Sequence, residues 1–211
     1  AQAIAGSILG RLVRTPKRHN VDPYAPWIDA MSAVRLGLRR PDDVEATSDG
    51  EVDGLAEVVE RYEAELRQAR AVDADGQIVT AIRVLLDDPP ARAAARLATR
   101  VLLVDEFQDL TPAHVLMLRL LGAPCWNVFG VGDDDQTIYG YNGADPTWLI
   151  EYDSLIPGAG THSLETNYRC PADVVQAADR LLRRNRRRVP KRILAAKAST
   201  GLRTVTDDNP V

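Results

Sequence analysis

Cysteine is scarce in this sequence, and so are aromatic residues and long apolar runs. Only Cys125 and Cys170 occur among 211 residues, too few for a disulfide framework and without the paired spacing of a zinc site. No apolar run approaches the roughly 20 residues that cross a bilayer, and no positively charged start leads into an apolar signal segment. These absences argue against a disulfide-rich domain and a membrane partner, and they make the cytoplasm the expected compartment.

The overall composition is that of a globular chain, with 45% hydrophobic and 5% aromatic residues, which favours helix. The formal net charge of -4 taken alone argues against a nucleic-acid binder. The distribution of the charges along the chain is uneven, however, and changes this interpretation. An acidic stretch from Asp42 to Glu65 is balanced by a basic run that contains no acid. This run comprises Arg183, Arg184, Arg186, Arg187, Arg188, Lys191 and Arg192. Two readings stay open for it, a track for a DNA backbone and a solvated helix end.

The first part of the chain, to about Thr99, reads as helices joined by polar loops. Apolar residues recur at steps of three and four along one predicted helix, and they are Val52, Leu55, Val58, Val59, Tyr62, Leu66 and Ala69. A shorter helix is expected through Trp27 and Met31, and the segment from Arg40 to Gly54 reads as a loop.

The pattern changes at Arg100. Val101–Val104 is a continuous apolar run, typical of a strand buried on both faces of a parallel sheet. Thr111-Pro112 supplies an N-cap and a first-turn proline for a helix, and a second strand is expected at Trp126–Val131. Strand, helix and strand at this spacing predict a right-handed crossover unit of an α/β domain.

Further along, a third strand is expected at His162–Glu165, followed by a helix from Pro171 to about Leu182. Two acids, Asp105 and Glu106, come directly after the first strand, where ligands sit in open parallel sheets. An Asp there can hold Mg²⁺, and the next acid can polarise the water that attacks a γ-phosphate. The plainer alternative is that two acids simply end a strand.

Three longer motifs decide between these readings. Val104–Asp109 reads VDEFQD, Gly130–Ala144 reads GVGDDDQTIYGYNGA, and Leu164–Arg169 reads LETNYR. In this order they resemble motifs of the superfamily 1 helicases related to UvrD, Rep and PcrA. The resemblance implies a partial P-loop NTPase (RecA-like) parallel sheet with an N-terminal helical subdomain. It divides the chain into an accessory subdomain at 1–99, the second half of one motor domain at 100–158, and the start of the next at 159–211.

The resemblance also implies roles around ATP. Asp105 is expected to ligate Mg²⁺, Glu106 to act as general base, and Gln108 to make a polar contact that couples the site to its neighbours. Gln136 is expected beside the γ-phosphate as a sensor of ATP state. Two further residues are expected from the second motor domain: Tyr168 to cover the adenine and Arg169 to act as an arginine finger. A surface ion pair is the alternative for Arg169.

Single-stranded DNA and duplex junctions are the partners that the resemblance implies. The stretch with Tyr139, Tyr141 and Asn142 is expected to meet DNA, where an aromatic ring stacks on a base. The sequence departs from the family here, because Tyr141-Asn142 stands where Trp-Arg is usual. Asparagine has neither the charge nor the planar fork of arginine, which puts the coupling between DNA and ATP in doubt. A weaker echo, Val72–Ile78, serves only as a marker of the accessory subdomain.

The sequence contains no Gly-x-x-x-x-Gly-Lys followed by Ser or Thr, the loop that cradles phosphates. We therefore interpret the chain as an internal fragment of a 3′-to-5′ DNA translocase that uses ATP and Mg²⁺. Negligible ATP turnover is expected from the isolated chain, as is self-association through exposed motor-domain surfaces. The alternative is a non-hydrolysing DNA-repair scaffold with a degenerate motor fold. A fused nuclease has no support, since no carboxylate-lysine cluster is visible.

Overall fold

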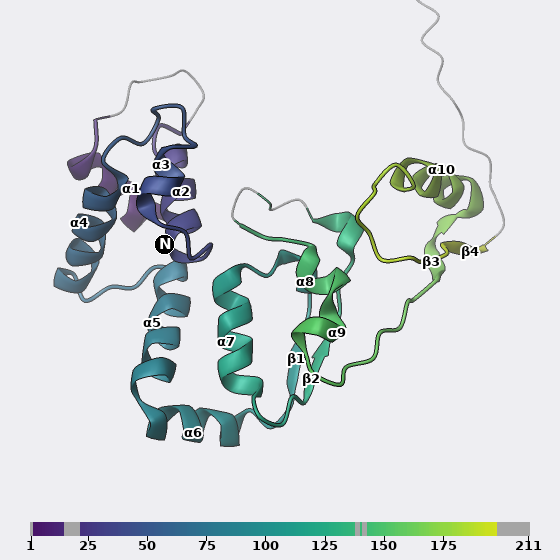
Figure 1. Cartoon of the computed structure of the whole chain (residues 1–211). Coiled ribbons are helices and arrows are strands. Elements are labelled where there is room, and N and C mark those ends of the chain that lie inside the picture. The colour runs from purple at the N-terminus through teal and green to yellow at the C-terminus, as the bar shows by residue number, and fades with distance from the viewer. Residues whose placement is uncertain (1, 15–21, 138–139, 141–142, 198–211) are drawn as a thin grey trace, which may run out of the picture. The chain divides into compact units, whose positions relative to one another are not determined.

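A computed structural model of the chain describes residues 2–14, 22–137, 140 and 143–197 (Figure 1). The chain forms two compact units, Ala1–Leu149 and Ile150–Val211. Both contain helices and short parallel strands, which confirms the expected α/β class. Within the described residues, no helix has the length and apolar character required to cross a membrane.

Four helices build the N-terminal part of the first unit, and their apolar sides share one core. They are α1 (Gln2–Leu12), α2 (Ala25–Arg35), α3 (Pro41–Glu45) and α4 (Leu55–Gln68). The predicted apolar face of α4 is confirmed, since Leu55, Tyr62 and Leu66 are buried. The loop expected at Arg40–Gly54 is wrong in part because α3 begins there, with a proline and two acids in its first turn, both favourable at a helix N-terminus.

Three longer helices follow in the first unit, and they are α5 (Ala74–Asp87), α6 (Pro89–Ala98) and α7 (Pro112–Gly122). The expected cap of α7 is confirmed, because the Thr111 hydroxyl accepts from the backbone N–H of His114. In return, Nδ1 of the His114 ring accepts from the backbone N–H of Thr111. In Figure 1, α5 and α7 lie side by side, and these two helices pack together. Arg96 of α6 donates to the Leu120 carbonyl at 2.7 Å, which holds α6 against α7.

Two short strands, β1 (Leu102–Val104) and β2 (Val128–Gly130), pair in parallel with Leu103 opposite Phe129. The helix α7 lies between them in the chain, so the predicted order of strand, helix and parallel strand is confirmed. One face of this sheet packs on α7, where a methyl group added to Gly122 would lie 3.2 Å from Val128 Cγ2.

Burial of this sheet on both faces was the expectation, and it is wrong for the described residues. Leu103 is 77% exposed and Phe129 is 61% exposed, although both are apolar. Their neighbours Leu102 and Val128 are half-buried on the α7 side. An apolar run thus identified the strands correctly, but only one face is covered within the described part of the chain.

In the second unit, β3 (Thr166–Pro171) and β4 (Leu194–Lys197) form a parallel pair, with α10 (Ala172–Leu182) between them in sequence. Two single-turn helices precede them: α8 (Thr147–Ile150), which spans the boundary between the two units, and α9 (Tyr152–Leu155). The strand expected at His162–Glu165 is wrong, since Leu164 is 92% exposed and pairing begins at Thr166 opposite Leu194. The start of β3 is set by its pairing with β4, a strand that lies far along the chain.

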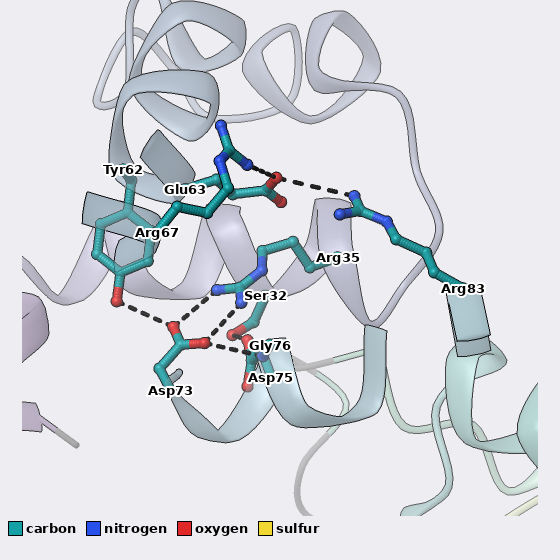
Figure 2. Close-up of polar contacts among 9 residues, drawn as sticks. All are labelled: Ser32, Arg35, Tyr62, Glu63, Arg67, Asp73, Asp75, Gly76 and Arg83. Carbon is teal, nitrogen blue, oxygen red and sulfur yellow. Dashed lines mark hydrogen bonds and ion pairs between the residues drawn. The ribbon is translucent and has the colours of Figure 1, made fainter. Parts of the chain in front are cut away.

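A buried ion pair joins the helical core to the start of α5 (Figure 2). Arg35, at the end of α2, donates from both terminal nitrogens to Asp73, at 2.8 Å and 2.6 Å. The same carboxylate accepts from the Tyr62 hydroxyl at 2.9 Å and caps α5 through the Gly76 backbone at 2.8 Å. Arg35 and Asp73 side chains are only 6% and 14% exposed. The pair therefore fixes α2, α4 and α5 against one another.

Electrostatics at Asp73 follow from two opposed effects. Burial raises the pKa of its carboxyl, but the hydrogen bonds and charge of Arg35, together with the hydrogen bonds from Gly76 and Tyr62, outweigh burial and lower the pKa to about 2. A carboxyl whose pKa falls on folding stabilises the folded state above its unfolded pKa, and this stabilisation is lost as the pH falls through the folded value.

We expect Asp73 to contribute about 2 kcal/mol to the free energy of unfolding above pH 4, lost between about pH 4 and pH 2. Urea unfolding across this range would measure it. Asp73→Asn keeps an acceptor for the α5 cap but has no titrating carboxyl, so its curve should lack this component. Asp43→Asn, in an exposed pair with Arg40, is the control. Parallel loss of stability in the unaltered protein and in Asp73→Asn would contradict the assignment.

Candidate active site

The ends of β1 and β2 meet at one edge of the sheet, because the two strands are parallel. Two backbone hydrogen bonds extend the ladder beyond the strands: Val131 N donates to Val104 O at 2.8 Å, and Phe107 N donates to Val131 O at 2.9 Å. The segments that follow the two strands are therefore held side by side. Ligands bind at this edge in open parallel sheets.

Asp105 and Glu106 follow β1 and are both exposed. Glu106 has φ 50° and ψ 47°, the left-handed conformation, and leads into the 3-10 turn η1 (Phe107–Asp109). For a residue with a Cβ this conformation costs roughly 1–3 kcal/mol and is common at functional sites. One Asp105 carboxylate oxygen accepts from the Glu106 backbone at 3.0 Å. The turn thus presents two adjacent acids at the rim of the sheet.

Gln108 connects the two strand ends. Its side chain is almost fully buried, its amide nitrogen donates to Glu106 Oε2 at 2.7 Å, and its amide oxygen accepts from the Asp133 backbone at 2.9 Å. A methyl group added at Gly132 would lie 2.5 Å from that oxygen, so glycine is required for the close approach. The amide therefore holds the catalytic candidate Glu106 against the segment after β2.

The connection continues to Gln136. Asp133 caps the 3-10 turn η2 (Asp134–Gln136), and its Oδ2 accepts from the Gln136 side chain at 2.7 Å. A continuous series of hydrogen bonds thus runs from Glu106 through Gln108 and Asp133 to Gln136. Three of the residues selected from the sequence lie together, while their roles stay predictions. Asp133 was missed, although an acid directly after a glycine at the end of a parallel strand was a usable signal.

Asp109, at the end of η1, is also part of this electrostatic environment. Burial, and then the negative charge of Glu106, raise the pKa of its carboxyl. Its Oδ1 is buried and has no hydrogen-bond partner among the described residues. An unpaired buried oxygen is unusual in a folded protein.

Carboxylate oxygens suited to a hard cation follow each of the two strands. Asp105 offers an exposed carboxylate at the strand end. The ligating atoms of Asp133, Asp134 and Asp135 lie within 4.8 Å of one another. Mg²⁺ prefers carboxylate and phosphate oxygens, so the donor chemistry of this edge fits that ion.

Tyr168 and Arg169 lie in the second unit. The register of β3 shifts between Asn167 and Pro171, which places both residues in a bulge. Asn167 Oδ1 accepts from the backbones of Arg169 and Cys170, at 2.9 Å and 2.8 Å. Tyr168 is 72% exposed, and Arg169 is exposed as well. A bulge re-aims side chains out of the pleat, so both side chains are available to a ligand.

The three residues expected to contact DNA, Tyr139, Tyr141 and Asn142, lie outside the described residues. Gly140 and Gly143 beside them are described, and Gly143 has φ +85°.

A parallel crossover unit with acids at its strand ends and a glutamine held beside them defines an α/β ligand-binding domain. Comparison with known proteins makes this specific. The model of the UvrD/REP helicase N-terminal domain matches residues 19–157, and the chain belongs to this family.

Curated relatives agree. "ATP-dependent DNA helicase PcrA" of Leuconostoc citreum is 33% identical over 77% of the chain and 22% of the relative. "ATP-dependent DNA helicase PcrA" of Staphylococcus aureus (strain Mu50 / ATCC 700699) is 30% identical over 87% of the chain and 26% of the relative. "Putative ATP-dependent DNA helicase YjcD" of Bacillus subtilis (strain 168) is 30% identical over 65% and 18%. The chain spans about a quarter or less of the length of these relatives.

Replacing the buried Gln108 by Met should lower the free energy of unfolding by about 1–3 kcal/mol, because the part-buried Asp133 N–H loses this acceptor. Urea unfolding at neutral pH measures this change. Gln136→Met removes one exposed hydrogen bond and should cost less than about 0.5 kcal/mol. Equal effects of the two substitutions would show that Gln108 does not connect the strand ends.

Proposed function

We propose that this chain is part of an ATP-dependent DNA helicase or translocase that moves 3′ to 5′ on single-stranded DNA and acts at duplex junctions. The observation that carries the proposal is the series of hydrogen bonds from Glu106 through Gln108 and Asp133 to Gln136. It connects a candidate base with a candidate phosphate sensor at the rim of a parallel sheet. Membership of the UvrD/REP family supports the same activity.

Each residue then has a chemical task. Asp105 holds Mg²⁺, which supplies neutralisation of phosphate charge when bound. Glu106 accepts a proton from the attacking water, and the Gln108 amide keeps its carboxylate oriented. Gln136 contacts the γ-phosphate and is itself oriented by Asp133. Phosphoryl transfer needs positioning and charge neutralisation more than covalent help, which these groups provide.

The second unit completes the proposal. Tyr168 covers the adenine of ATP, and Arg169 approaches the γ-phosphate as an arginine finger delivered by domain closure. In this view residues 1–99 form the accessory subdomain, 100–158 the second half of a RecA-like P-loop NTPase domain, and 159–211 the start of its partner domain. DNA contacts Tyr139, Tyr141 and Asn142, with stacking that is blind to base sequence.

In the complete protein, Glu106→Gln should lower DNA-stimulated ATP turnover by about 100-fold or more, because the general base is lost. ATP binding should be retained, since the amide keeps the shape of the side chain. Steady-state turnover and nucleotide binding would be measured together. Glu57→Gln, which alters an exposed helical acid, is the matched control and should be fully active.

Turnover by Glu106→Gln at the unaltered rate would refute the assignment of the base. Absence of DNA-stimulated turnover in the unaltered complete protein would instead favour the non-hydrolysing DNA-repair scaffold. The 211-residue chain by itself should show negligible turnover, since its sequence has no phosphate-cradling loop.

The exposed apolar face of the first sheet supports self-association of the isolated chain. Leu103 and Phe129 are register neighbours on that face and are largely exposed. We expect the chain to form dimers or larger species in sedimentation equilibrium, and Leu103→Gln with Phe129→Gln to shift it toward monomer. Leu97→Gln, on α6, is the control. A monomer at the highest concentration would contradict the proposal.

A further inference from the structure

The end of α2 contacts three other segments of the first unit. We refer to Arg35, Leu36 and Gly37 as the α2 corner. The Arg35 side chain reaches Asp73 at the start of α5 through two hydrogen bonds. Figure 2 shows the guanidinium and the carboxylate facing each other, with Tyr62 of α4 beside them. The corner is thereby tied to both the helical core and α5.

Leu36 makes the second contact. Its carbonyl accepts from the Ala113 backbone at 2.9 Å. The last carbonyls of one helix and the first N–H groups of another lack partners within their own helices. Here the carbonyl of Leu36 at the end of α2 and the N–H group of Ala113 at the start of α7 are hydrogen-bond partners. Since α7 begins three residues after η1 ends, the corner contacts the chain seven residues after Glu106.

Gly37 makes the third contact. A methyl group added to Gly143 would lie 3.5 Å from Gly37 Cα, so the two backbones pack closely. A methyl group at Gly37 would overlap the Ala33 carbonyl oxygen, which makes glycine necessary at the corner. Gly143 directly follows the stretch assigned to DNA. The corner thus touches the segment after the candidate DNA loop on one side and the helix after the catalytic acids on the other.

We propose that Arg35 and Asp73 are positioning residues that couple DNA binding to ATP hydrolysis by fixing the α2 corner between these two segments. The inference rests on the proposed function. A pair that is buried, bidentate and shared by three helices holds one arrangement of its partners. An exposed single contact such as Arg11 with Glu65, at 56% and 36% exposure, has no such geometry and joins α1 only to α4.

Three variants of the complete protein test this. Arg35→Met with Asp73→Asn removes the pair without leaving an unpaired buried charge, and asparagine still accepts from Gly76. Arg35→Lys keeps the charge but loses the planar fork. Arg11→Met with Glu65→Gln is the matched control, because it removes an ion pair that does not reach the corner.

The first readout is ATP turnover with and without single-stranded DNA. In the pair-less variant, DNA stimulation of kcat should fall about 10-fold, while basal kcat and the KM for ATP stay within about twofold. Arg35→Lys should restore part of the stimulation, and the control should keep all of it. Full stimulation in the pair-less variant, or an equal loss of basal and stimulated turnover, would overturn the inference.

The second readout is hydrogen exchange of the Ala113 amide, which does not depend on activity. It should exchange about 10-fold faster in the pair-less variant than in the control. Unchanged exchange would overturn the inference. Glu106→Gln separates the two proposals: if it abolishes turnover while the pair-less variant retains full DNA stimulation, only the positioning role fails. If the unaltered protein has no turnover, the proposed function fails, and the Ala113 exchange still reports on the corner.

Discussion

The parallel pairing of β1 and β2 is the constraint on which the candidate site depends. Parallel strands end at the same edge, so residues that follow each strand become neighbours although α7 separates them in sequence. The Gln108 side-chain amide carries a donor and an acceptor, so it can hydrogen-bond to both strand ends at once. A carboxylate in its place could accept but would repel Glu106, and an aliphatic group could not accept from the Asp133 N–H. Glutamine meets both demands.

The Arg35–Asp73 pair serves a different purpose from the apolar core beside it. Removing two charges from water is costly, and a buried pair often stabilises no more than apolar residues of similar volume. The pair contributes a defined geometry. A planar guanidinium that binds a carboxylate through two hydrogen bonds permits one arrangement of the two groups, whereas apolar contacts tolerate several. A second contact between α4 and α5, from Arg83 to Glu63 at 3.7 Å, is far more exposed and constrains less.

Local signals in the sequence predicted much of this fold, and non-local ones did not. The α4 stripe, the Thr111 cap and the strand, helix and strand order depend on neighbours within a few positions, and the structure confirms them. The start of β3 depends on β4, and the Arg35–Asp73 pair spans 38 positions, so neither had a local signature. Hydrogen bonds connect Glu106 with Gln136, and their proximity was predictable because both residues follow strands that the apolar pattern identified.

The departure from the family at Asn142 bears on the coupling role that we propose for the α2 corner. Arginine is usual at that position in the family, and asparagine cannot supply its charge or its fork. If the proposed roles of the acids, the glutamine and Arg169 hold, the proposed DNA-binding stretch and ATP site need a physical connection that does not use a guanidinium at position 142. Backbone packing of Gly143 on Gly37, and the bond from Ala113 to Leu36, supply one that uses no charged side chain at the loop itself. Arg35, whose charge is buried against Asp73, is one residue from Leu36 and two residues from Gly37. Solvent and salt screen a buried charge little.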